Sequence, residues 1–261
     1  MTFVPKFVRA LPKRSLLTLA SLAVVLIAMF TFVVVDRTAA TRTLATFVDS
    51  REESVPQLTY RDDIPTALWV GDSFTQGGAA YPRIICAQLG CYCNIDAQGS
   101  TGFINEGAPE GRAFTSRIID RLPTSIKHFE ADLIILDGGR NDMSSDPNDV
   151  LEAMTTYVDA IRGAWPAAEL VIIVPYRIET EPSYAYSEWL PGIEDLASSA
   201  GAVVLDPYVE GWFDGADTSK MVIEDNFHPN EFGNSYIASK IKESLERAHV
   251  VTPGSPNGGL G

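Results

Sequence analysis

The chain has 261 residues, of which 46% are hydrophobic and 21% are charged, so it is long enough for one full-sized domain with additional segments. Its formal net charge is −14 and its pI is about 4.6. This acidity argues against a nucleic-acid partner, because binding of nucleic acid depends on Lys and Arg that neutralise phosphates.

The N-terminal region combines a basic start with an apolar run. Residues 1–14 carry basic side chains and no acid, and residues 15–35 (SLLTLASLAVVLIAMFTFVVV) carry no charge. A helix of about 20 apolar residues spans a bilayer core, and its basic flank stays in the cytoplasm. We therefore expect a cytoplasmic segment at 1–14, a transmembrane signal anchor at 15–35, and an extracytoplasmic domain tethered to the membrane. The alternatives are a cleaved signal peptide, which would make the protein secreted, and a buried core helix.

A repeating pattern follows a linker at residues 36–64. Short apolar runs predict buried strands at 66–70, 91–97, 131–139, 169–176 and 202–207. Helices are expected at 79–89, 114–121, 147–164, 187–199 and 230–247. This alternation predicts an α/β domain over residues 65–249, with a parallel sheet covered by helices on both faces. The Gly- and Pro-rich residues 250–261 are predicted to be a disordered tail.

Three cysteines, Cys86, Cys91 and Cys93, lie close together in the sequence. Disulfides persist in exported domains, so one bridge is expected, from Cys86 to either Cys91 or Cys93, with one thiol left over. No second group of Cys or His residues is spaced to complete four metal ligands. We expect neither a metal nor a cofactor.

Four polar groups follow predicted strands or precede the last helix, where ligands of such folds bind. They are VGDSFTQGG (70–78), Gly99, GGRND (138–142) and EDNFHPN (224–230). A serine such as Ser73 is a weak nucleophile until a base removes its proton. Of the three histidines, only His228 lies in a loop before a helix with a carboxylate, Asp225, three residues earlier. Such a carboxylate orients the imidazole and stabilises the imidazolium ion.

An acyl-transfer site also needs hydrogen-bond donors for the oxyanion that develops on the substrate. Asn141 has a side-chain amide in a turn that follows two glycines. Gly99 has no side chain, so it can bring its backbone N–H close to a substrate. The backbone N–H of Ser73 is the third candidate donor.

The blocks Gly71-Asp72-Ser73, Gly99, Gly139-Arg140-Asn141-Asp142 and Asp225-Asn226-Phe227-His228 resemble those of the SGNH/GDSL hydrolase family of esterases and lipases, in order and in spacing. The resemblance covers about residues 66–247. It implies a three-layer α/β/α sandwich with a five-stranded parallel sheet, similar to flavodoxin. It also implies that Ser73 is the nucleophile, that His228 is the general base oriented by Asp225, and that Ser73, Gly99 and Asn141 form the oxyanion hole.

Some residues of these blocks leave alternatives open. Gly102 is a possible substitute for Gly99, and Phe74, where the family's name-giving motif has Leu, is expected to pack rather than react. Arg140 and Asp142 either support the Asn141 turn, which we favour, or touch the substrate. Aromatic residues of the loops either line a binding site or pack its rim; they are Phe103, Tyr176, Tyr184, Tyr186, Trp189, Trp212 and Phe213.

The expected function is that of an extracytoplasmic serine carboxylester hydrolase that forms an acyl-enzyme on Ser73. Its substrates would be acyl or acetyl esters of envelope glycans, lipids or small molecules. An acyltransferase that uses the same triad and a sugar acceptor is one alternative, and a non-catalytic, membrane-anchored binding domain is another. The activity of the enzyme is expected to fall as His228 becomes protonated.

Overall fold

The computed structural model describes residues 60, 63–107 and 115–250. The chain divides into residues 1–57 and 58–261, and every described residue belongs to the second unit. Within these described ranges, no helix is long and apolar enough to cross a bilayer. The predicted segments 1–14 and 15–35 lie outside them, as do most of the linker and the tail, so the domain boundaries stay predictions.

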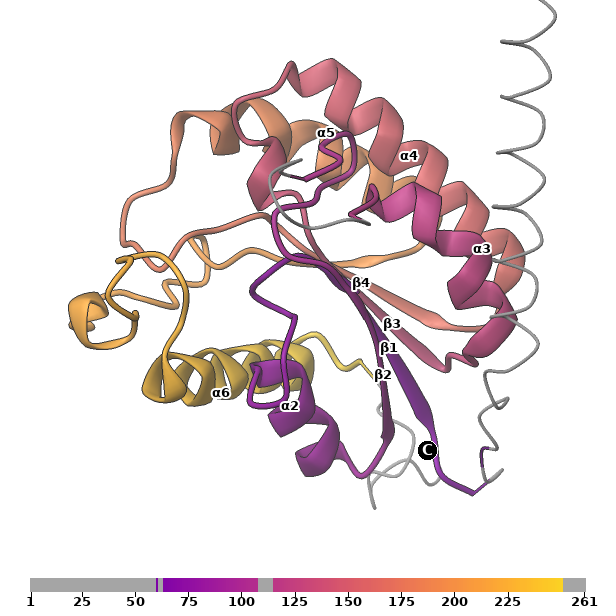
Figure 1. Ribbon diagram of the computed structural model, residues 1–261, viewed down its shortest axis with the longest axis horizontal. Coiled ribbons are helices and arrows are strands. Elements are labelled where there is room, and N and C mark those ends of the chain that lie inside the picture. Colours follow the sequence, from indigo (N-terminus) through magenta and orange to yellow (C-terminus); the bar gives the residue numbers. More distant parts are fainter. Residues whose placement is uncertain (1–59, 61–62, 108–114, 251–261) are drawn as a thin grey trace, which may run out of the picture. The chain divides into compact units, whose positions relative to one another are not determined.

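A parallel sheet of five strands forms the centre of the domain (Figure 1). The strands are β1 (Thr66–Gly71), β2 (Tyr92–Ala97), β3 (Leu133–Asp137), β4 (Glu169–Ile173) and β5 (Val203–Leu205). They pair in the order β2-β1-β3-β4-β5, and every pair is parallel. This is the strand order of flavodoxin, and it confirms the predicted α/β fold with its five-stranded parallel sheet.

Helices cover both faces of the sheet (Figure 1). One face carries α2 (Tyr81–Leu89) and α6 (Glu231–Arg247), and the other carries α3 (Ile118–His128), α4 (Pro147–Ala164) and α5 (Tyr184–Ala200). Because side chains alternate along a strand, β1 contributes Trp69 to the core under α2 and α6, and Leu68 to the core under α3, α4 and α5. Both faces of the strands are buried, which explains their continuous apolar runs.

The helix predicted at residues 114–121 is the element that the sequence placed least well. Helix α3 begins at Ile118 and continues to His128, through Pro123. A proline inside a helix costs about 3 kcal/mol, which favours a helix that ends before it. Ile118 and Leu122 are nevertheless buried against the sheet, and their burial offsets that cost.

The predicted disulfide was wrong, because all three cysteines are free. The Cys91 thiol donates to the backbone carbonyl of Cys86 at 3.7 Å, and the Cys93 thiol donates to the carbonyl of Pro82 at 3.5 Å. Each thiol thus has a backbone acceptor at helix α2, and the cluster packs as small apolar side chains with weak donors.

Candidate active site

A tight turn directly after β1 positions Ser73. An added side-chain carbon at Gly71 would lie 2.3 Å from Thr75 Oγ1 and 2.6 Å from the backbone oxygen of Asp137, so only glycine fits. The buried Asp72 carboxylate accepts a hydrogen bond from the N–H of Phe74 at 3.0 Å. The turn therefore holds Ser73, which is half-buried, at the carboxyl end of β1.

A second tight turn, just before α6, positions His228. Asp225 Oδ1 accepts hydrogen bonds from the N–H groups of Phe227 and His228, both at 2.9 Å. Asn226 takes a left-handed conformation with φ of 57°, which asparagine tolerates better than most residues. The N–H of Ile223 donates to the carbonyl of His228 at 2.9 Å and closes the turn. This turn brings the Asp225 carboxylate next to Nδ1 of the His228 imidazole.

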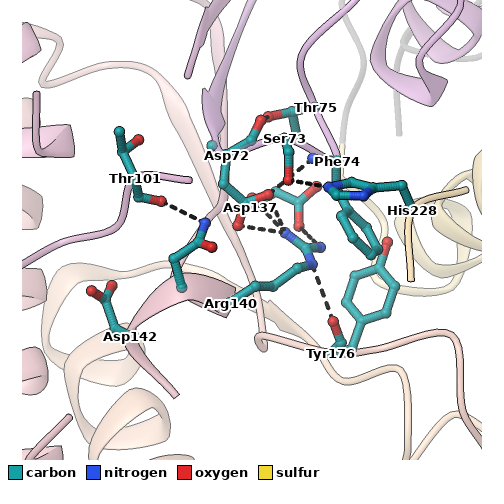
Figure 2. Close-up of polar contacts among 12 residues, drawn as sticks. Asp72, Ser73, Phe74, Thr75, Thr101, Asp137, Arg140, Asp142, Tyr176 and His228 are labelled. Atoms are coloured by element: carbon teal, nitrogen blue, oxygen red, sulfur yellow. Dashed lines mark hydrogen bonds and ion pairs between the residues drawn. The ribbon is translucent and has the colours of Figure 1, made fainter. Parts of the chain in front are cut away.

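The two turns meet, and they place three side chains in a chain of hydrogen bonds. His228 Nε2 lies 2.8 Å from Ser73 Oγ, and His228 Nδ1 lies 2.6 Å from Asp225 Oδ2. Figure 2 shows the imidazole ring turned toward Ser73. The hydrogen bond with His228, helped by the two backbone N–H groups, lowers the pKa of Asp225 to about 2. Asp225 is therefore ionised, as a group that must stabilise an imidazolium ion requires.

The strand register brings the candidate oxyanion donors to the same edge of the sheet. Gly71 pairs with Ala97 of β2 and with Asp137 of β3. Ser73 and Gly99 therefore each follow the paired position by two residues, and Asn141 follows it by four. The Asn141 amide donates one hydrogen to the carbonyl of Thr101 at 2.9 Å, and an amide has a second one.

Gly99 and Gly102, which the sequence left as alternative oxyanion donors, differ in where their backbone N–H groups donate. The N–H of Gly102 donates to the carbonyl of Asn105 at 2.9 Å, within its own loop. The N–H of Gly99 instead donates to the side chain of Gln76 at 2.7 Å. Gln76 belongs to the turn that carries Ser73, residues 71–76, which we call the nucleophile turn. The Gly99 N–H therefore faces the turn that carries Ser73, whereas the Gly102 N–H is used within its own loop, so the assignment of Gly99 as an oxyanion donor stays a prediction.

Asp142 holds the Gly99–Asn105 loop against the end of β3. Its carboxylate accepts hydrogen bonds from the N–H groups of Phe103 at 2.6 Å and Asn105 at 3.0 Å. Asp142 is completely buried. Its carboxylate therefore has a structural role, but the role is at the neighbouring loop rather than at the Asn141 turn that the sequence favoured.

Arg140 supports the nucleophile turn through a buried ion pair with Asp72. Its guanidinium is only 1% exposed and contacts Asp72 at 3.3 Å and Asp137 at 2.5 Å. It also donates to the carbonyl of Tyr176 at 3.1 Å, as Figure 2 shows. Burial raises the pKa of Asp137 to about 6, against the opposing effect of the Arg140 charge. Arg140 thus has a structural role, but its contacts are with Asp72, the end of β3 and Tyr176 rather than with the Asn141 turn that the sequence favoured, and its guanidinium is buried away from a substrate.

Three residues of this region escaped sequence reasoning. Asp137 ends an otherwise apolar strand, and such a buried acid is a signal for a charged partner. The Tyr81 hydroxyl donates to Asp137 from helix α2, more than fifty residues away in the chain. No local sequence pattern predicts that contact. The third residue is Gln76, whose contact with Gly99 is likewise not predicted by any local pattern.

The aromatic residues near the site mostly pack. Phe74 is 1% exposed, and its ring centre lies 5.1 Å from that of Phe227 and 5.8 Å from that of His228, which confirms that it packs. Of the loop aromatics, five are buried: Phe103, Tyr176, Trp189, Trp212 and Phe213. Tyr184 is 81% exposed at the start of α5.

Comparison with known proteins agrees with this geometry. The GDSL-like lipase/acylhydrolase family matches residues 69–236. The chain belongs to this family. It is 27% identical over 198 residues to a GDSL lipase of Mycobacterium tuberculosis, and the match covers 68% of this chain and 79% of the relative. The protein is therefore a serine esterase of the SGNH/GDSL type.

Solved structures of esterases share the fold. A family two carbohydrate esterase from Clostridium thermocellum, solved with cellohexaose, is 14% identical with a TM-score of 0.56 and covers 74% of this chain and 67% of its own. The carbohydrate acetylesterase Est24 from Sinorhizobium meliloti is 14% identical with a TM-score of 0.53, over 70% of this chain and 99% of its own. At these identities, the similarity concerns the SGNH/GDSL fold.

The activity of this esterase is expected to fall toward acid pH in a single-proton step. The folded pKa of Asp225, about 2, lies below the ordinary value of 3.8. The stabilising effect of its charge is therefore complete above about pH 4 and lost only as the pH falls through about 2. Protonation of the base His228 is then the event that removes activity. The logarithm of kcat/KM for an aryl acetate should rise with a slope of one on the acid limb; a slope of two would contradict this assignment.

Proposed function

We propose that the protein is an extracytoplasmic, membrane-tethered carboxylester hydrolase that removes acyl or acetyl groups from envelope glycans through an acyl-enzyme on Ser73. The observation that carries the proposal is the continuous Ser73–His228–Asp225 hydrogen-bond chain, with separations of 2.8 and 2.6 Å, in a member of the GDSL family. A nucleophile within hydrogen-bond reach of a base, which a third group orients, is the arrangement that acyl transfer requires.

In the proposed reaction, Ser73 Oγ attacks the ester carbonyl carbon while its proton passes to His228 Nε2. The negative charge on the carbonyl oxygen is stabilised by the N–H groups of Ser73 and Gly99 and by the second hydrogen of the Asn141 amide. His228 then returns the proton to the departing alkoxide, which leaves as an alcohol. Water attacks the acyl-enzyme, with His228 again the base, and releases the acid and free Ser73.

The exposed acidic side chains of the loop that carries Asp225 and His228 favour an uncharged substrate. The loop between β5 and α6 carries the exposed acids Asp214, Asp217 and Glu224, and its exposed Lys220 is paired with Asp217 at 2.9 Å. Such a field repels anionic lipids and leaves neutral esters unaffected. Together with the structural similarity to two carbohydrate esterases, this supports acylated glycans over anionic lipids.

The proposed location rests on the sequence. Residues 15–35 are uncharged and long enough to span a bilayer, and they follow a basic segment. An anchored enzyme acts most readily on a substrate that is fixed near the membrane, such as an envelope glycan.

One labelling experiment tests both the chemistry and the location. Intact cells that express the full chain or its Ser73→Ala variant are treated with a fluorophosphonate that cannot cross the cytoplasmic membrane. We expect labelling of the wild type, mapped to Ser73 by peptide mass spectrometry, and none of the variant. Labelling by a permeant probe alone would contradict the extracytoplasmic location, and failure of both probes on folded protein would contradict the nucleophile.

The substrate and the fate of the acyl group are tested with purified protein. An acetylated neutral oligosaccharide should release free acetate faster than an anionic acyl lipid releases its fatty acid. If an added sugar takes up the acetyl group faster than acetate appears, the enzyme is a transferase instead.

A further inference from the structure

The side chain of Gln76 accepts a hydrogen bond from the N–H of Gly99, which is one of the three donors of the proposed oxyanion hole. Gln76 lies three residues after Ser73, and its own N–H donates to the carbonyl of Asp72 at 3.1 Å, which fixes its backbone to the nucleophile turn. Its side-chain Oε1 accepts the hydrogen bond from the N–H of Gly99 at 2.7 Å. The residue is exposed.

A backbone N–H has one hydrogen, so Gly99 cannot donate a full hydrogen bond to Gln76 and to a substrate oxygen at the same time. The register places Gly99 beside Ser73, since each lies two residues beyond the paired Gly71 and Ala97. A hydrogen bond of 2.7 Å is short for an N–H donor. The Gly99 donor becomes available to the reaction when the Gln76 amide moves away from it.

We propose that Gln76 is a positioning residue whose amide oxygen stands in for the substrate oxygen at Gly99 until the oxyanion forms. This inference rests on the proposed function. An amide oxygen and an ester oxygen are both neutral acceptors, so the ester in the ground state gains little by displacing Gln76. The oxyanion is charged, and a hydrogen bond to a charged acceptor is about twice as strong.

The charged oxyanion therefore displaces Gln76 more readily than the neutral ester does, so the Gly99 donor acts mainly in the transition state, in competition with the Gln76 oxygen. Because Gln76 is exposed, its amide regains hydrogen bonds to water once it is displaced, and the cost of its departure is small. A Gln76 side chain that merely held the Gly99 loop in place would not need to move.

Two substitutions at Gln76 are expected to act in opposite directions. Gln76→Ala removes the competing acceptor, so kcat/KM for an aryl acetate should rise by about two- to tenfold, the range of one net hydrogen bond. Gln76→Glu keeps the shape but places a carboxylate on the Gly99 N–H, which binds it more strongly and repels the oxyanion. Its kcat/KM should fall by more than tenfold. The exposed Gln88 on α2 supplies the matched control, and Gln88→Ala should leave kcat/KM unchanged.

A spectroscopic readout on the full-length protein separates displacement from support. With 15N-glycine labelling, the amide proton of Gly99 should shift between the wild type and Gln76→Ala when both are free. After Ser73 has reacted with a fluorophosphonate, the two proteins should give the same Gly99 shift, because the phosphonyl oxygen has replaced Gln76 in the wild type.

The inference is overturned if Gln76→Ala falls below wild-type kcat/KM, if Gln76→Glu keeps it, or if the Gly99 shifts still differ in the adducts. A wild type that neither hydrolyses esters nor reacts with fluorophosphonate would instead contradict the proposed function. In that case the Gly99 shift of the free proteins still reports whether Gln76 holds the donor.

Discussion

Ser73→Ala and His228→Ala are each expected to lower kcat for an aryl acetate by about 10⁴- to 10⁶-fold, and the double variant is expected to lose no more than either single one. The physical reason is that Ser73 Oγ and His228 Nε2, 2.8 Å apart, act as one unit. A serine without its base keeps its proton, and a base without its serine has no proton to take. The rate that remains comes from the oxyanion donors and substrate binding, which all three variants keep.

This prediction has a matched control and a clear contrary outcome. His128 lies at the end of α3, on the opposite side of the sheet from α6, and His128→Ala should retain wild-type kcat. Burst and steady-state kinetics on the same preparations, with unfolding curves to verify folding, supply the measurement. Losses that multiply in the double variant would show that Ser73 and His228 contribute independently, which would contradict the triad.

The fold and the reacting side chains were accessible from sequence because each has a local signature. Continuous apolar runs mark strands that are buried on both faces, and α4 occupies the predicted residues 147–164, with Asp146 as its cap. Ser73 and His228 could be paired because the chain has so few histidines and because both follow the rule that sites form at the carboxyl ends of strands. The positions of helix ends depend on tertiary packing, and α3 shows this by continuing through Pro123.

The residues that sequence reasoning missed act through contacts between distant segments. Asp137 could be recognised as a strand end, but its partner Arg140 was assigned only to its own turn. The Tyr81 contact with Asp137 joins helix α2 to β3, and the bond from Gly99 to Gln76 joins two loops. Side-chain hydrogen bonds of this kind depend on three-dimensional register, which a single sequence does not reveal.

Arg140→Met is expected to lower the free energy of unfolding by about 3–5 kcal/mol, the usual result of removing one partner from a buried ion pair. The variant would leave the Asp72 and Asp137 carboxylates buried at 0% exposure without a cation. Lys242→Met is the matched control, because Lys242 and Glu246 form a solvent-exposed pair on α6 at 2.8 Å. Loss of an exposed pair should cost no more than about 1 kcal/mol. Urea unfolding of the two variants supplies the comparison.

The pH dependence of this loss identifies the buried charge as its cause. The folded pKa of Asp137, about 6, lies above the ordinary value of 3.8. Between about pH 4 and 6 the folded protein therefore holds a proton that the unfolded chain has released, so the contribution of Asp137 to stability falls as the pH rises through this window. Because the Arg140 charge holds this pKa down, Arg140→Met should raise it further, so the variant should be more destabilised relative to wild type at pH 8 than at pH 5. Adding Asp137→Asn should recover part of the loss at pH 8, because it removes one of the two uncompensated carboxylates.

The contrary outcome is an equal loss at both pH values with no recovery in the double variant. The guanidinium of Arg140 lies 4.3 and 4.4 Å from the ring centres of Phe74 and Tyr176. That outcome would mean that Arg140 acts through packing on these rings rather than through its charge.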